Sequence, residues 1–166
     1  MRLVIHDLES DYFEQRFSGQ LSNWHVISPT TPIHHCLGCF GCWVKTPGAC
    51  VIQDQYANLG ELLALCQEVL IISRCCYGGF SPFVKNVLDR SIPYIHPFFV
   101  NKHGEMHHRR RYSNRSRLKV WFYGETTEHE KITALGLVQA NAVNFWWEAA
   151  GVEFYGDPAE MEGRMP

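Results

Sequence analysis

The chain has 166 residues, of which 46% are hydrophobic and 19% are charged, and its formal net charge is −2. This length suits one globular domain spanning 1–166, because two independent domains would each be too small to bury a good core. No apolar stretch approaches the roughly 18 residues that cross a bilayer, and the excess of acidic residues argues against nucleic-acid binding, so we expect neither a membrane nor a nucleic acid as a partner.

The N-terminus begins with a short apolar run, Leu3–Ile5, and turns acidic at Asp7. It lacks the apolar core and the small-residue cleavage site of a signal peptide, so we expect the protein in the cytoplasm. A second apolar run, His25–Ile27, is followed by polar residues and proline. Both runs are typical of buried strands.

A helix is expected after Asp54, a residue type that caps helix N-termini. The apolar residues that follow are spaced i, i+3, i+4 and i+7, which places them on one face of a helix: Leu59, Leu62, Leu63 and Cys66. The next run, Val69–Ile72, is continuous, as in a parallel strand covered on both faces. We expect it to be the central strand.

Two further helices have clear start signals. Ser81 is an N-cap residue with Pro82 at the first helical position. Thr127 and Glu130 form a capping box that opens a long helix, which we expect to end at Ala149–Gly151.

Two more apolar runs, Leu118–Tyr123 and Val152–Tyr155, bring the expected strands to five. Strands that alternate with helices predict a parallel sheet with helices on both faces. We therefore predict an α/β, flavodoxin-like fold with strand order 2-1-3-4-5. The stretch Ile92–Ser116 is too long for an ordinary connection, and we expect an irregular segment that serves function or an interface.

Two loops carry the chemistry. The first is Ser73–Ser81, where two glycines and two aromatic residues follow the central strand. Because ligands bind at the carboxyl ends of parallel strands, this loop suits a planar heterocycle, although its glycines equally suit a tight turn alone.

The second loop holds four of the seven cysteines: Cys36, Cys39, Cys42 and Cys50. Disulfides are not expected in a reducing cytoplasm. The C-x2-C-x2-C spacing resembles a ferredoxin run and admits a [4Fe–4S] cluster, a four-cysteine zinc site is a second interpretation, and reduced, partly buried thiols are a third. From the sequence we favour the third, and all three stay open.

Together, the run CLGCFGCWVKTPGAC at Cys36–Cys50 and the run YGGFSPFVKNVLDR at Tyr77–Arg90 resemble the flavodoxin-like NADPH-dependent FMN reductase family, over about residues 33–125. The spacing of the cysteines is similar to the compact motif of iron–sulfur flavoproteins in that family. The resemblance implies FMN as cofactor, NAD(P)H as electron donor and a homo-oligomer. It assigns the flavin site to Cys75, Cys76, Tyr77, Gly78, Gly79, Phe80 and Gly124.

The chain departs from the family in the loop after the first strand. The family places a Gly-Ser-Pro-Arg loop there to hold the FMN phosphate at a helix N-terminus. This chain has acidic residues instead, at Asp7, Glu9 and Asp11. These carboxylates would repel a phosphate, so we predict few or no phosphate contacts in this loop.

The sequence thus favours an NAD(P)H-dependent FMN oxidoreductase that passes electrons to an acceptor it does not identify, with catalytic residues unassigned. The alternative is a non-enzymatic flavodoxin-like electron carrier or binding module, which the altered first loop favours. Residues 101–119 carry seven basic side chains and one acidic side chain. For these we expect a solvated loop or a subunit contact.

Overall fold

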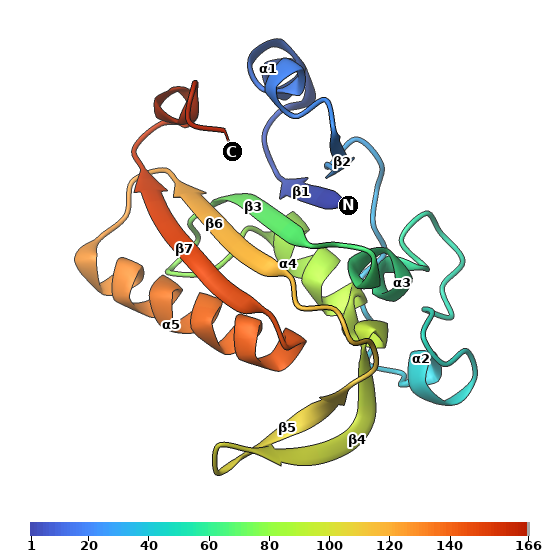
Figure 1. The fold of residues 1–166 in the computed structure, drawn as a ribbon. Helices are drawn as coiled ribbons and strands as arrows, with labels where there is room; N and C mark the ends of the chain where they lie inside the picture. The colour runs from blue at the N-terminus through green and yellow to red at the C-terminus, as the bar shows by residue number, and fades with distance from the viewer. Residues whose placement is uncertain (166) are drawn as a thin grey trace.

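A parallel sheet of five strands runs through the computed structural model, which describes residues 1–165 (Figure 1). Pro166, the last residue of the expected domain, lies outside the described residues. The strands are β1 (Arg2–His6), β2 (Trp24–Ile27), β3 (Glu68–Arg74), β6 (Arg117–Tyr123) and β7 (Glu148–Tyr155). Their order is β2-β1-β3-β6-β7, and every neighbouring pair is parallel. The predicted order 2-1-3-4-5 is confirmed, because β4 and β5 form a separate pair.

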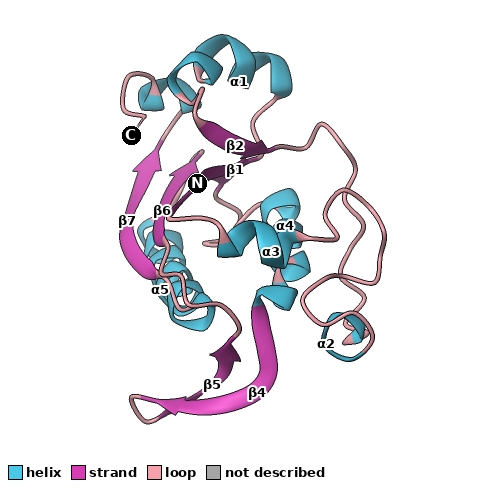
Figure 2. Ribbon diagram, turned by 45° about the vertical axis from the view of Figure 1, so that its right-hand side comes forward, coloured by secondary structure: helices cyan, strands magenta, loops and turns pink. Residues whose placement is uncertain are grey.

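Helices cover both faces of the sheet, so alternate residues of each strand enter different cores (Figure 2). In β1, Leu3 and Ile5 pack in the core formed with α3 (Leu59–Ala64), α4 (Pro82–Arg90) and α5 (Glu128–Phe145). Val4 packs on the other face, with α1 (Ser10–Arg16), with the residues that flank the 3-10 turn η1 (Ser18–Gln20), and with the 3-10 turn η3 (Pro158–Met161). The continuous apolar runs of the central strands are therefore explained by burial on two sides.

The two predicted helix starts are confirmed. The Ser81 side chain accepts a hydrogen bond from the Val84 amide at 3.4 Å, with Pro82 at the first helical position of α4. At α5, Thr127 Oγ1 accepts from the Glu130 amide and the Glu130 carboxylate accepts from the Thr127 amide. Both caps are local, so a sequence pattern predicts them well.

The expected helix after Asp54 begins later. Its first helical residue is Leu59, with Asn58 at the N-cap. Asp54 instead accepts a hydrogen bond from the Tyr56 amide at 3.0 Å and pairs with Arg90. The side chain that was expected to cap a helix is used by a partner distant in sequence.

The end of α5 also differs from the prediction. The helix stops at Phe145 because Trp146 adopts the left-handed conformation, with φ of 61°. The Trp146 indole donates to the His108 carbonyl at 2.9 Å, and Lys102 lies over its ring. Residues Ala149–Gly151 therefore belong to β7 and not to the helix.

The stretch expected to be irregular, Ile92–Ser116, contains regular structure. It opens with the 3-10 turn η2 (Ile92–Tyr94) and continues as an antiparallel hairpin of β4 (Ile95–Lys102) and β5 (Glu105–Arg110) that projects from the main sheet (Figure 1). Its residues are mostly exposed or half-buried, so no continuous apolar run announces it in the sequence.

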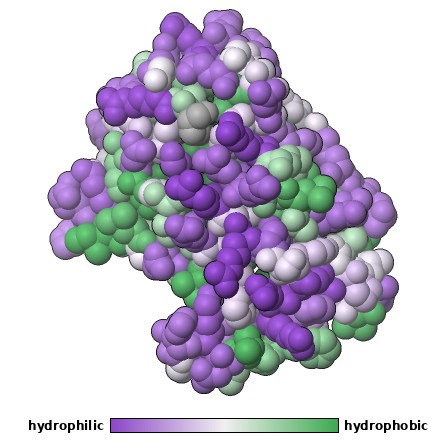
Figure 3. All heavy atoms as spheres, in the orientation of Figure 1, coloured by the Kyte–Doolittle hydropathy of each residue, from purple (hydrophilic) through white to green (hydrophobic). Residues whose placement is uncertain are grey.

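On the face seen in Figure 3, hydrophobic side chains gather at the edges, over α5 and over the short helix α2 (Gly41–Val44). Val44 in α2 and Ile132 in α5 are among the exposed apolar residues. Between them the surface is largely hydrophilic. In residues 1–165, no helix is long and apolar enough to cross a membrane.

Candidate functional site

The four cysteines of the loop surround one cavity of about 290 Å³. Cys36 and Cys39 are exposed at its rim, and Cys42 and Cys50 are buried. Its other walls are mainly apolar: Leu37, Phe40, Ile52, Ile92 and Pro93. The cavity therefore offers four sulfur atoms in surroundings that provide few other ligands.

Two left-handed residues shape the loop around this cavity. Gly38 has φ of 62° and Phe40 has φ of 54°, so both residues adopt the left-handed conformation between Cys36 and Cys42. Phe40 is a strained residue for this conformation, since a side chain at positive φ costs about 1–3 kcal/mol. Its ring stacks on Trp43 at 5.4 Å, and the Trp43 indole donates to the Ile95 carbonyl at 3.0 Å. Contacts with η2 and β4 thus stabilise the strained turn.

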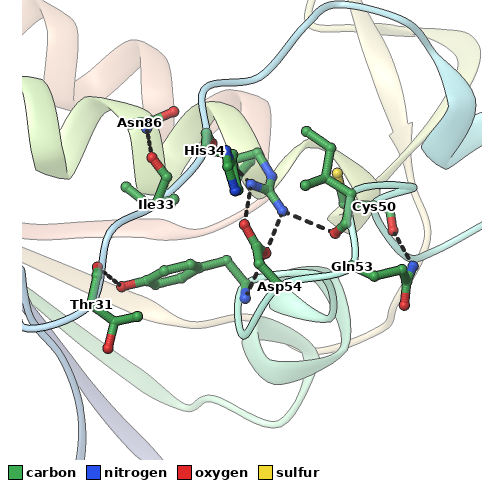
Figure 4. A network of polar contacts seen from close by, with 10 residues as sticks. Thr31, Ile33, His34, Cys50, Gln53, Asp54 and Asn86 are labelled. Carbon is green, nitrogen blue, oxygen red and sulfur yellow. Dashed lines mark hydrogen bonds and ion pairs between the residues drawn. The ribbon is translucent and has the colours of Figure 1, made fainter.

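A buried ion pair fastens the loop to α4 (Figure 4). The Arg90 side chain is fully buried, and its two terminal nitrogens contact the two oxygens of Asp54 at 2.7 and 2.9 Å. The same nitrogens donate to the carbonyls of His34 at 2.9 Å and Ile52 at 3.4 Å. Residues on both sides of the cysteine loop are therefore tied to one guanidinium.

The pKa values of these groups follow from burial and from the ion pair. The Arg90 hydrogen bond is the main reason that the pKa of Asp54 is lowered. Burial alone would lower the pKa of Arg90, but the Asp54 contact and the nearby Cys50 outweigh it and the pKa is raised. Burial, followed by the charges of Cys50, Cys36 and Cys39, raises the pKa of Cys42 to about 11. The four sulfurs are thus close enough to repel one another as thiolates, and a bound cationic centre would relieve this repulsion.

A single metal ion is a poor fit to this arrangement. Within the described part of the chain, no three or more His, Cys, Asp or Glu side chains are placed to hold one ion. The cysteines surround a wider space. A cluster, whose irons are ligated separately by thiolates, is a better match than zinc for four sulfurs spread around a cavity.

The Ser73–Ser81 loop is a tight turn at the carboxyl end of β3. Cys76 and Gly79 exchange both backbone hydrogen bonds at 2.9 Å, and Tyr77 and Gly78 between them have φ of 54° and 78°. This pair of positive φ values defines a type I′ turn. The Ser73 hydroxyl accepts from the Ser81 amide at 2.9 Å and closes the base of the loop.

The residues assigned to the flavin site face different surroundings. Tyr77 is 93% exposed, whereas Phe80 is buried and stacks on Phe122 at 5.3 Å. A Cβ on Gly78 would lie 2.7 Å from Thr133 in α5, so this glycine is required by packing. A Cβ on Gly79 would meet only the Cys76 carbonyl closely, at 3.3 Å.

Cys75 and Gly124 lie beside the same turn. The Cys75 amide donates to the Tyr123 carbonyl at 2.9 Å, next to Gly124, which has φ of 98°. Only one side-chain atom, in Arg74, would come within 4 Å of a Cβ at Gly124. The turn and Gly124 thus leave room for the face of a flat ligand beside Tyr77.

The loop after β1 closes the adjacent position. Both oxygens of the Asp7 carboxylate accept from the Arg74 amide, at 2.9 and 3.2 Å. Burial raises the pKa of Asp7, and its contacts with Ser81, Arg74 and Tyr123 offset this only in part. A cavity next to it has two further carboxylates, Glu9 and Asp157, in its walls. The residues present fit the ring of a flavin but not the phosphate of FMN at this loop.

The two loops lie at opposite ends of α4, although loops that follow parallel strands are expected to meet at one edge of the sheet. The turn precedes Ser81, at the start of the helix, whereas the cavity is walled by Asp89 and Arg90 at its end. The chain reaches this position by running along α4, where Asn86 donates to the Ile33 carbonyl at 3.3 Å. Nine helical residues separate the two sites by roughly 13 Å.

Sequence reasoning assigned no role to Arg90 and expected Asp54 to be a helix cap. Arg90 ends the run YGGFSPFVKNVLDR, so its position inside a recognised motif was the available signal. The ion pair joins residues 36 positions apart and leaves no local pattern.

No protein-family model matches the chain. Solved structures with the same arrangement of strands and helices include the Trp repressor binding protein from Bacillus subtilis, with a TM-score of 0.54 and 10% identity over 99% of this chain and 92% of that one. The chain has the flavodoxin-like fold. General stress protein 14 of Treponema denticola, solved in complex with FMN, gives a TM-score of 0.55 and 10% identity over 96% of this chain and 88% of that one.

A third solved structure is an FMN-dependent NADH-azoreductase from Bacillus anthracis in complex with FMN, with a TM-score of 0.53 and 9% identity over 96% of this chain and 90% of that one. In sequence, the chain is 29% identical over 102 residues to an iron–sulfur flavoprotein from Archaeoglobus fulgidus, a match to 61% of this chain. The chain matches only 42% of that relative's length. These matches confirm the resemblance that the sequence motifs indicated.

Proposed function

We propose that this protein is an electron-transfer oxidoreductase of the iron–sulfur flavoprotein kind. It holds a [4Fe–4S] cluster on Cys36, Cys39, Cys42 and Cys50 and binds a flavin ring beside Tyr77. The observation that carries the proposal is the single cavity around which the four cysteines lie. The match to an iron–sulfur flavoprotein supports it independently.

The cluster accounts for the cavity better than free thiols do. Thiols that serve packing alone would fill the interior, as Cys66 does where it donates to the Leu62 carbonyl. The four loop cysteines instead border a space lined with apolar side chains, which would exclude water from a bound cluster.

The flavin is proposed from the turn at Cys76–Gly79 and from the FMN that is bound to structures of the same fold. A flavin accepts two electrons and a cluster carries one at a time, so the pair would connect a two-electron donor such as NAD(P)H to a one-electron acceptor. The role of this chain is to position both groups at the two ends of α4. We further propose a homo-oligomer.

A second candidate function is an electron carrier that uses the cluster without FMN. Asp7 favours it, because its carboxylate takes the Arg74 amide and brings negative charge to the loop where related proteins are expected to hold a phosphate. In this case the flavodoxin-like fold serves as the scaffold for the cysteine loop.

Anaerobic purification followed by iron, sulfide and flavin assays tests both candidates. We expect about four iron and four sulfide per chain, and a brown colour. Flavin recovered with the protein supports the oxidoreductase, and iron and sulfide without flavin support the carrier. Absence of iron after anaerobic reconstitution with iron and sulfide would refute both candidates. Zinc bound in place of iron would show that the four cysteines form a structural zinc site.

A further inference from the structure

Arg90 has a donor that the protein itself does not use. A guanidinium has five N–H groups. Four are accounted for by Asp54, which takes two, and by the carbonyls of His34 and Ile52. The fifth, on Nε, is buried and has no hydrogen-bond partner among residues 1–165.

Leaving this buried N–H without a partner destabilises the folded protein. The Arg90 side chain has no exposed surface, so water does not reach the guanidinium. A buried donor without a partner costs about 1–3 kcal/mol, and more on a charged group. An isolated buried cation is also unfavourable, and only one carboxylate, that of Asp54, offsets its charge. Buried polar groups without a partner are uncommon in folded proteins, and a bound group that accepts the hydrogen is one explanation.

The position of Arg90 indicates what completes it. The residue forms part of the wall of the cavity that the four cysteines surround. Cys50 lines the same cavity, and among the four cysteines it is the one that contributes to the raised pKa of Arg90. The buried cation and the four cysteines thus border the same cavity.

From this geometry we propose that Arg90 is a positioning residue that donates its Nε–H to the sulfur of Cys50 and stabilises the reduced state of the bound cluster. The proposal rests on the proposed function, since it requires the cluster. Four thiolates outweigh the positive charge of the iron–sulfur core, and reduction adds one more electron. A buried cation beside the sulfur therefore favours the reduced form, and hydrogen bonds to cluster sulfurs raise the reduction potential.

Variants of Arg90 and Asp54 separate an electrostatic role of Arg90 from a purely structural one, because the two roles predict different shifts of the midpoint potential. Arg90→Gln removes the cation and should shift the midpoint potential of the cluster to a more negative value. Asp54→Asn breaks the same ion pair but leaves the cation less neutralised, so the potential should stay unchanged or become more positive. If both variants shift the potential in the same direction, the ion pair acts only by holding the loop, and the proposal is wrong.

A second measurement does not depend on any variant folding. Wild-type protein labelled with ¹⁵N-arginine and reduced anaerobically should show a weak ¹⁵N coupling to the cluster in pulsed electron paramagnetic resonance. Absence of that coupling in a protein that contains the cluster would refute the role of Arg90 and leave the proposed function intact. Absence of a cluster from the wild-type protein would refute both.

Discussion

The two ends of helix α4 have opposite chemistry. At its start, Asp7 turns its carboxylate onto the Arg74 amide and lies beside Ser81, so the polar groups there satisfy one another. At its end, Arg90 keeps one buried N–H without a partner, next to a cavity that contains four cysteines. The Asp7 carboxylate at the start of the helix is thus paired within the protein, whereas the end of the helix borders a cavity.

This difference changes the relative weight of the two cofactors. The sequence drew attention to the flavin, because the turn around Gly78 resembles a known motif. In the structure, packing explains this turn without a flavin, since Gly78 packs on α5. Packing does not explain the cysteine loop in the same way, because its four cysteines line a cavity. The cavity thus supports the proposed cluster, whereas the FMN bound to structures of the same fold supports the proposed flavin.

The largest expected effect is at the cysteine end. Replacing any one of the four loop cysteines with serine should remove most of the bound iron, because each thiolate supplies one ligand. Cys42→Ser is the sharpest variant, since Cys42 is buried in the cavity wall. Cys66→Ser is the matched control: Cys66 is also buried but lies outside the cavity, so this variant should keep the iron content of the wild type. Equal iron content in the two variants would contradict the proposal that the loop cysteines hold the iron.

The next effect is at the opposite end, in the stability of the apo protein against acid. His6 is 1% exposed, and burial lowers its pKa to about 4, although a backbone contact with Leu8 acts in the opposite direction. Between this value and 6.5 the unfolded chain binds the proton and the folded chain does not. The stability contribution is therefore full above about pH 6.5 and is lost as the pH falls towards 4, by about 3 kcal/mol in total.

His6→Phe tests this prediction, because phenylalanine can keep the stack on Phe13. Urea unfolding at pH 7 and at pH 4 should show a loss of stability in the wild type that is about 3 kcal/mol greater than in the variant. Other carboxyl groups, including Asp54, also respond to acid, but they are present in both proteins. Their contribution to the pH dependence of stability therefore cancels in the comparison. An identical pH dependence would show that His6 is hydrated or paired in solution.

Gly78 and Gly79 distinguish a turn built for packing from one built for a ligand. Gly78→Ala should lower the free energy of unfolding by about 2 kcal/mol, because it combines positive φ with a clash against Thr133. Gly79→Ala should cost much less, since it has neither problem. Urea denaturation of the apo variants measures both. If Gly79→Ala proves the more destabilising, the packing of this turn has been misread.

The smallest effect concerns the choice of flavin. In the wild type we expect FMN and riboflavin to bind with similar affinity, because Asp7 repels the phosphate. Asp7→Asn should improve FMN binding over riboflavin roughly tenfold, or about 1.4 kcal/mol. Fluorescence titration of the two flavins measures this ratio. A wild-type protein that already prefers FMN strongly would show that the phosphate is held at another place.

The sequence by itself determined the features that depend on neighbours along the chain. Alternation of apolar runs with helix signals predicted five parallel strands and their order, because right-handed crossovers leave few arrangements. Ser81 and Thr127 marked helix starts because a cap bonds to amides within three residues. The cysteine spacing likewise predicted that four sulfurs could converge in one loop.

Only the tertiary structure decided where those elements meet. The Arg90–Asp54 pair takes the cysteine loop to the far end of α4, and Trp146 ends α5 early by bonding to the hairpin. At the start of α4, the Asp7 carboxylate accepts a hydrogen bond from an amide 67 residues away in the sequence. In each case the deciding contact joins residues far apart in sequence, and its strength depends on burial, which no local pattern reports.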